Sequence, residues 1–170
     1  MDGIHEYLQH AQQELLHCAL QDWWQRHSVS LGKEIPERRF LDFFARAALL
    51  SGNTRLLDFM LARGANANHT DGGVPLIFFA LTPISRNGFS CLPLLKSLIA
   101  AGANVNGTNP VGGLTPLMAA INANAVPHAV LLLDAGADPW HASEVLGMNA
   151  IEYAAALNAP VFLELMRESY

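Results

Sequence analysis

Residues 115–138 read TPLMAAINANAVPHAVLLLDAGAD, and the local structure that this segment predicts recurs along the 170-residue chain. Thr115 can cap a helix with its hydroxyl, and Pro116 suits the first helical position because proline has no N–H and its φ is preset. The apolar run VLLL at 130–133 lies in a second helix, which Gly136 can end by adopting the left-handed conformation. The segment therefore predicts a helix pair followed by a turn.

Two markers of this segment recur at nearly constant spacing. The glycine motif occurs three times, with glycines 38 and 34 residues apart, as RGANANHT at 63–70, AGANVNGT at 101–108 and AGADPWHA at 135–142. The helix start also occurs three times, 41 and 34 residues apart, as VPLIFFAL at 74–81, TPLMAAI at 115–121 and NAIEYAAAL at 149–157. Two independent markers with similar periods indicate structural repeats.

These motifs resemble the ankyrin repeat, a unit of about 33 residues with a T-P-L-H-x-A helix start, a second helix and a G-A-D/N loop. The resemblance covers roughly residues 37–170 and implies an all-α solenoid of four repeats, because helix pairs with two apolar faces have to stack. We expect the repeats to span about 35–68, 69–106, 107–140 and 141–170.

Residues 1–34 precede the repeats and are expected to form an N-terminal capping helix and its connector. Apolar side chains from Ile4 to Trp23 fall on one face of a helix across residues 4–27, with Gln, Glu and His on the other face. The end repeat of a solenoid exposes an apolar side. We therefore expect this helix to cover the first repeat.

The sequence departs from the family pattern at the helix starts. Ile77, Met118 and Glu152 replace the family's histidine, so other groups have to secure these turns. In the last copy Asn149 can cap the helix while Glu152 reaches back to its N–H as a capping box.

Two connectors also differ in length. The first inter-repeat connector is shorter than the next two, and DGG at 71–73 is expected to form its turn. The second repeat is longer than the third by seven residues, and the surplus falls at 82–93, where Pro83 and Gly88 predict a surface loop. That loop is either a functional surface or a tolerated insertion.

The composition limits the class of protein. Hydrophobic residues make up 51% and charged residues 15% of the chain, so it folds rather than remaining disordered. No apolar run reaches the roughly 18 residues of a membrane span, and MDGIHEYLQH at the start is unlike a secretory signal. Cys18 and Cys91 share no disulfide or metal spacing. We expect a cytoplasmic protein with no membrane partner.

Acidic residues gather in the last third of the chain. Residues 1–110 contain nine Lys or Arg and nine Asp or Glu, whereas residues 111–170 contain six acids and Arg167 as the single base. This charge repels the phosphates of nucleic acids and favours a basic protein as a partner. An acidic surface that serves solubility explains the same excess.

No constellation for catalysis, metal binding or cofactor binding is visible. The seven histidines lack metal-ligand spacing, the glycine pairs 72–73 and 112–113 do not form a phosphate-binding motif, and no nucleophile motif occurs. The sequence therefore predicts a non-catalytic protein without a metal or cofactor.

Partners of ankyrin repeats usually contact the hairpin tips and the exposed ends of the first helices, which together line a concave groove. Carried onto this sequence by register, the resemblance implies these partner-binding residues: His69, Thr70, Asp71, Leu81, Thr108, Asn109, Val111, Asn122, Asp138, Trp140, His141, Ser143 and Glu144.

Trp140 and the acids around it bear most directly on the partner. Trp140 stands where the other copies have asparagine. It either packs beneath the hairpin, which we favour because large aromatic side chains are mostly buried, or anchors an interface. Glu144 and Asp138 would orient a cationic partner towards the last two repeats.

The resemblance and the charge together lead to a hypothesis about function. We expect a monomeric module that binds another protein stoichiometrically, and the sharper hypothesis is a small bacterial inhibitor or immunity-type protein that masks a basic toxin or enzyme. The alternative is an adaptor or effector scaffold that bridges two proteins. An enzyme is the least supported class, because the sequence shows no catalytic constellation.

Overall fold

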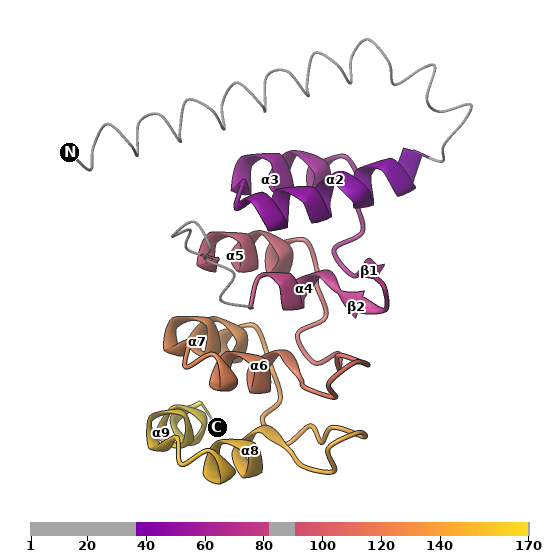
Figure 1. The fold of residues 1–170 in the computed structure, drawn as a ribbon. Coiled ribbons are helices and arrows are strands. Elements are labelled where there is room, and N and C mark those ends of the chain that lie inside the picture. The colour runs from indigo at the N-terminus through magenta and orange to yellow at the C-terminus, as the bar shows by residue number, and fades with distance from the viewer. Residues whose placement is uncertain (1–36, 82–90, 170) are drawn as a thin grey trace, which may run out of the picture.

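The computed structural model describes residues 37–81 and 91–169, and for residues 37–40 it describes the backbone alone. The described residues form four stacked helix pairs (Figure 1). We call the pairs units 1 to 4. Their helices are α2 Glu37–Ser51 and α3 Thr54–Ala62, α4 Leu76–Phe79 and α5 Leu92–Ala100, α6 Pro116–Asn122 and α7 Val126–Asp134, and α8 Ala150–Ala156 and α9 Pro160–Glu168.

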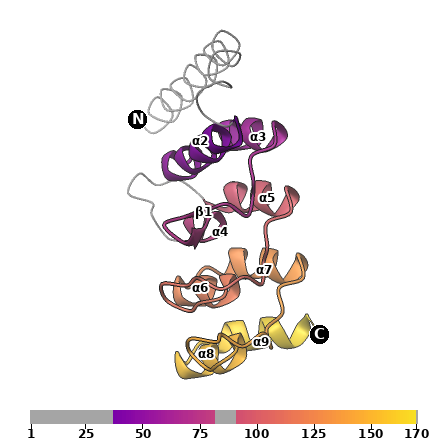
Figure 2. The same ribbon diagram turned by 90° about the vertical axis from the view of Figure 1, so that its right-hand side faces the viewer.

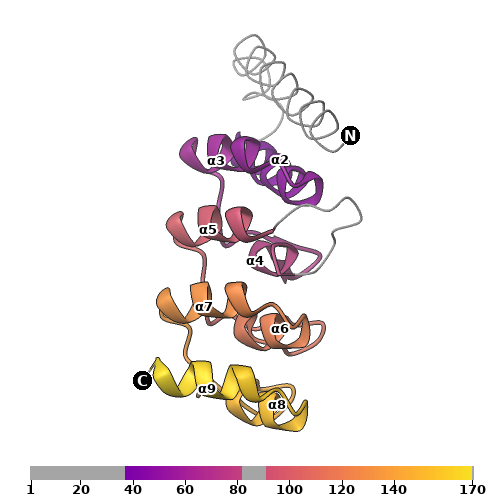
Figure 3. The ribbon, with the colours of Figure 1, turned by 90° about the vertical axis from the view of Figure 1, so that its left-hand side faces the viewer.

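The first and second helices of the units form two parallel columns (Figure 3). Helices α2, α4, α6 and α8 contact one another in that order, and α3, α5, α7 and α9 do the same. Each unit therefore packs mainly on its neighbours, which is the organisation of a solenoid. The expectation of an all-α repeat fold is confirmed.

One apolar core runs through all four units. The second helices contribute the stripes that the sequence predicted, including Leu57 and Met60 in α3, Leu94 and Leu98 in α5, and Phe162 in α9. Burying a side chain of this size stabilises the fold by roughly 1.5–3 kcal/mol. The stripes follow the helical spacing of three and four residues, so the core is continuous along the column.

The starts of α6 and α8 are closed by side chains within the first turn. Thr115 Oγ1 accepts the Met118 N–H at 3.2 Å, and Met118 Sδ accepts the Thr115 N–H at 3.5 Å. Asn149 Oδ1 accepts the Glu152 N–H at 3.0 Å, and Glu152 Oε2 accepts the Asn149 N–H at 2.9 Å, which confirms the predicted capping box. The residue in the place of the family's histidine therefore secures each of these turns.

Unit 2 begins differently. Pro75 has φ −61° and ψ 145°, so it is extended rather than helical, and α4 starts one residue later than the match to Pro116 implies. The side chain of Val74 is a hydrocarbon and has no oxygen that could cap the helix, unlike the side chain of Thr115 in unit 3. α4 also ends early, at Phe79, so it has four residues where α6 has seven.

The loops between units project as hairpins from one edge of the stack, to the right in Figure 1, and they face the viewer in Figure 2. In loop 64–75, β1 Thr70–Asp71 pairs antiparallel with β2 Val74–Pro75 around Gly72 and Gly73, which have φ 57° and 87°. This confirms the predicted DGG turn. Loops 102–115 and 136–149 are closed by backbone hydrogen bonds from Asn109 to Leu114 and from Ser143 to Met148. Their tips contain four residues instead of two, so the first hairpin is the shortest, as predicted.

Several predictions concern residues outside those that the structure describes. These are the capping helix at 4–27 with its histidines, Cys18, and positions 82–90 of the expected surface loop. Within the described part of the chain, no helix has both the length and the apolar character that crossing a membrane requires.

Candidate functional site

The three loops contact one another and form a continuous surface, which we call the hairpin edge (loops 64–75, 102–115 and 136–149). A methyl group at Gly73 would lie 3.6 Å from Pro110 Cγ, so the first loop touches the second. At Gly113 a methyl group would lie only 2.5 Å from Val145 Cβ, so the second and third loops approach even more closely. Each loop therefore limits the positions that the next loop can adopt.

Two asparagines bridge successive loops in the same way. Asn68 Nδ2 donates to the Gly102 carbonyl at 2.9 Å, and Asn68 Oδ1 accepts the Asn104 N–H at 2.6 Å. The side chain of Asn106 binds the Gly136 carbonyl and the Asp138 N–H in the same manner, at 3.1 and 2.7 Å. We call Asn68 and Asn106 the bridging asparagines. They fix the position of each loop relative to the next.

Unit 1 uses a carboxylate from α2 in place of a bridging asparagine. The buried Asp42 accepts the Asn66 N–H through Oδ1 at 2.7 Å, and its Oδ2 lies 3.4 Å from His69 Nδ1. One turn further along α2, Arg46 Nε lies 2.7 Å from Asp71 Oδ2 and its guanidinium lies 5.9 Å from the centre of the Phe79 ring. The sequence analysis missed Asp42 and Arg46. Their spacing of four residues, which places two opposite charges on one helix face, was the available signal.

These contacts change the role expected of His69 and Asp71. Both side chains are about one-third exposed and both are paired with residues of α2. The ion pair between Arg46 and Asp71, at this exposure, contributes roughly 0–1 kcal/mol. The pairs therefore orient the first hairpin on α2, and a partner would meet side chains that are already engaged.

The remaining predicted site residues fall into three groups. The exposed ones are Thr70, Val111, Asn122, Trp140, His141 and Glu144, and the half-buried ones are Thr108, Asn109 and Asp138. Leu81 and Ser143 are buried, at 4% and 1% exposure, so neither offers its side chain to a partner. Leu81 packs into the core where unit 2's first helix ends, and Ser143 Oγ accepts the Leu146 N–H at 3.1 Å beneath the close approach of two loops.

Asn109 and Asp138 shape loops. Asn109 Oδ1 accepts the Val111 N–H at 3.0 Å, and Asp138 Oδ1 accepts the Trp140 N–H at 2.9 Å. Side-chain oxygens that bond two residues ahead stabilise tight turns. The charge of Asp138 is therefore part of the loop structure, and reversing it would disturb the turn as well as the surface potential.

Trp140 is 62% exposed, so the favoured expectation that it packs beneath the hairpin is wrong. Val111 and Val145, on the tips of the second and third loops, are exposed to a similar extent. The last two loops of the hairpin edge therefore each carry exposed apolar side chains. Exposed groups of large apolar side chains commonly mark interaction sites.

The charge of the described surface is uneven. From residue 111 onwards the described residues include six acids and Arg167 as the one base, and Glu144 lies exposed at the tip of the third loop. No three His, Cys, Asp or Glu side chains among the described residues come together as a metal site. Burial lowers the pKa of His128 and raises the pKa of Cys91.

A pocket of about 400 Å³ lies between units 3 and 4, beside the turns that join α6 to α7 and α8 to α9. It is lined by Asn122, Asn124, Leu157, Asn158 and Val161, among others. None of the described residues that line it is an acid, a base or a nucleophile.

Comparison with known proteins agrees with the repeat pattern. Residues 44–141 match the family model described as ankyrin repeats, in three copies. The match spans units 1 to 3 and ends in the third loop, before α8 and α9. A search of curated proteins found no match to the chain.

Proposed function

Since the chain belongs to the ankyrin repeat family, whose repeats generally mediate protein–protein interactions, we propose that it acts by stoichiometric, non-catalytic binding of a partner protein at the hairpin edge. The main support for this proposal is that the three loops hold one another in place. The bridging asparagines join successive loops by hydrogen bonds, and Gly113 lies close to Val145 of the next loop. A surface that is rigid before binding loses little conformational entropy on association.

The uneven charge supports a basic partner. Six acids and one base among the described residues after 110 create a negative potential, which speeds encounter with a positive surface. We propose on this ground that the protein is a small bacterial inhibitor or immunity-type protein that masks a basic toxin or enzyme. An inhibitor of this kind would be recovered with one partner, whose activity it abolishes.

Reversal of one exposed charge tests the electrostatic part of this proposal. Glu144→Lys changes a residue on the tip of the third loop, and we expect it to slow association with the partner by about tenfold at low salt, with little effect in high salt. Glu164→Lys is the matched control, because Glu164 is exposed on α9, in the column away from the hairpin edge. Equal association rates for the two variants would contradict binding at the acidic end of the edge.

An adaptor is the second candidate function. A depression of about 500 Å³ lies between α3 and α5, in the second column, and is lined by Leu61, Ala62, Lys96 and Ala100, among others. A second protein could bind there while the first occupies the hairpin edge. Co-purification from the native cell separates the two candidates, because an adaptor is recovered with at least two proteins.

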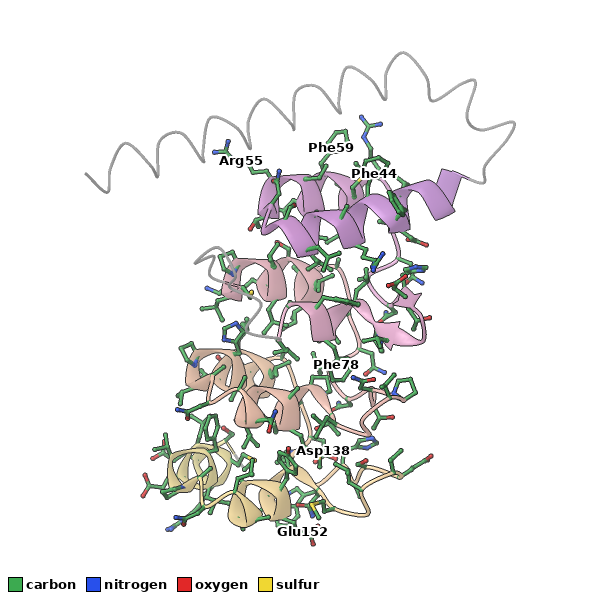
Figure 4. The ribbon with its side chains drawn as sticks, in the orientation of Figure 1. Phe44, Arg55, Phe59, Phe78, Asp138 and Glu152 are labelled. Atoms are coloured by element: carbon green, nitrogen blue, oxygen red, sulfur yellow. The ribbon has the colours of Figure 1, made fainter. Side chains whose placement is uncertain are left out.

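We also propose the finer architecture, in which units 1 to 4 are four ankyrin repeats and residues 1–34 cap unit 1. An apolar helix face across residues 4–27 matches the need of an end unit for a cover. Phe44 and Phe59 lie at the outer side of unit 1, where such a cover would bind (Figure 4). Deleting residues 1–34 should lower the melting temperature, and an unchanged value would contradict the cap.

A further inference from the structure

We propose that Trp140 is the anchor of the partner contact, and that its ring receives an arginine or lysine side chain from a basic segment of the partner. Glu144 and Glu152, which are exposed near the same end of the hairpin edge, would attract that segment. This inference rests on the proposed protein-binding function and names the chemistry of the contact.

The first argument is the register of the loops. Trp140 follows Asn106 by 34 residues and occupies the position of the bridging asparagines. Asn68 and Asn106 both reach from their own loop to the next loop, at distances of 2.6 to 3.1 Å. In the third loop this position carries a large aromatic side chain that is 62% exposed. Asn68 and Asn106 contact the next loop from this position. Trp140 is therefore placed to contact a partner protein that lies beyond unit 4.

The second argument is the chemistry of the outer side of unit 4. Met118 and Leu133 are buried in unit 3, and the residues 34 positions later in unit 4 are Glu152 and Arg167, which are both exposed. These charged replacements suit contact with water. A tryptophan that stays 62% exposed at this end of the stack gives up apolar burial that would stabilise the fold, which is typical of an interface anchor.

The surroundings of Trp140 favour a cation as the group that binds it. The Pro139 carbonyl accepts the Ala150 N–H at 3.1 Å, so Trp140 lies beside the start of α8, whose first turn carries Glu152. Figure 4 shows Glu152 at the end of the stack and Asp138 close to unit 3. An aromatic face near carboxylates attracts lysine or arginine by cation–π and ionic interactions together. The same carboxylates repel the phosphates of a nucleic acid.

A labelled octaarginine peptide provides a probe that does not depend on the native partner. Its binding to the full chain is measured by fluorescence anisotropy, with octaglutamate as the control peptide. The variants are Trp140→Ala, Trp140→Phe, which retains an aromatic face, and Val161→Ala, which shortens an apolar side chain that is 56% exposed on α9. Because Trp140 is largely exposed, all variants should keep the circular dichroism spectrum of the wild type.

We expect octaarginine, but not octaglutamate, to bind, and Trp140→Ala to weaken its binding by about fivefold, which corresponds to one exposed cation–π contact. Trp140→Phe should remain within about twofold of the wild type, as should Val161→Ala. Equal weakening by Trp140→Ala and Val161→Ala, or an unchanged affinity of Trp140→Ala, would overturn the assignment of the ring as a cation receptor.

The outcomes also separate this inference from the proposed function. If octaarginine binding is unaffected by Trp140→Ala while Glu144→Lys still slows association with the native partner, the acidic edge binds protein but the anchor is wrong. If Trp140→Ala weakens the native complex and octaarginine does not bind at all, the group that Trp140 receives is apolar, and the cation assignment is overturned.

Discussion

Asp138 donates its backbone N–H to Oδ1 of Asn106 at 2.7 Å, and this bond joins two loops that are 32 residues apart in the sequence. The side chain of Asn106 also donates from Nδ2 to the Gly136 carbonyl at 3.1 Å. Asn68 makes the equivalent pair of bonds to the second loop. The bridging asparagines thus satisfy backbone groups that follow the ends of α5 and α7, and they hold the three loops of the hairpin edge in one arrangement.

Asn106→Ala should lower the free energy of unfolding by about 1–3 kcal/mol, because it leaves the Asp138 N–H and the Gly136 carbonyl without their bridging partner. Urea denaturation followed by circular dichroism measures the change. Asn104→Ala is the control, since Asn104 Oδ1 accepts the N–H of Asn106, which belongs to the same loop. If both variants lose the same stability, the bonds between loops are not what stabilises this edge.

Gly113→Ala should destabilise the second and third loops. Gly113 has φ 68°, and an added methyl group would lie 2.5 Å from Val145 Cβ, so both the backbone and the packing oppose any side chain. We expect a loss of about 1–3 kcal/mol, measured by thermal denaturation. Gly112→Ala in the same turn is the matched control, because no atom lies within 4 Å of its added methyl group. A similar loss for the two variants would show that the close approach is not important.

Much of the fold was predictable because it depends on short-range chemistry. Caps such as Thr115 and Asn149 bond residues three positions ahead, and Gly136 ends a helix through its own φ of 87°. These signals lie within a few residues of each other in the sequence. The extended Pro75 was not predicted, although the missing cap at Val74 is its physical reason.

The candidate site was predicted less well because its contacts join distant segments. Nothing local marks Asn106 as a bridge, since the groups that it bonds are 30 and 32 residues away. Ser143 looked like a polar tip residue, and the approach of a neighbouring loop buries it. Trp140 was expected to be buried on its residue type, whereas it occupies the position from which Asn68 and Asn106 reach the next loop, and among the described residues no fourth loop follows to cover it.

Leu132→Ala should cost about 2–5 kcal/mol of unfolding free energy, because Leu132 is completely buried in α7 and its removal leaves a cavity in the shared core. Chemical denaturation provides the measurement. Val130→Ala, two residues away on the same helix, changes a side chain that is 37% exposed and should cost less than about 1 kcal/mol. A cost for Leu132→Ala no larger than that of the control would contradict the position of the core.

We expect His128 to make the stability of the fold depend on pH. Leu94 and Phe162 occupy the same place in α5 and α9 and are buried, whereas the half-buried His128 has an Nδ1 without a hydrogen-bond partner in the described structure. Burial lowers the pKa of His128 below its ordinary value of 6.5. The unfolded chain therefore takes up a proton near pH 6.5, whereas the folded chain takes it up only at lower pH. The contribution of this residue is thus fully present above pH 6.5 and is lost as the pH falls from there through the folded pKa.

His128→Leu removes both the unsatisfied nitrogen and this proton linkage. We expect the variant to melt at a temperature equal to or above that of the wild type, and to lose less stability between about pH 7.5 and about pH 5.5. Differential scanning calorimetry at the two pH values measures the difference, and His141→Leu, at an exposed position, should retain the pH dependence of the wild type. A pH dependence that is the same in His128→Leu and in the wild type would show that the acid sensitivity of the fold arises elsewhere, because His128 would then bind its proton equally well in the folded and unfolded chains.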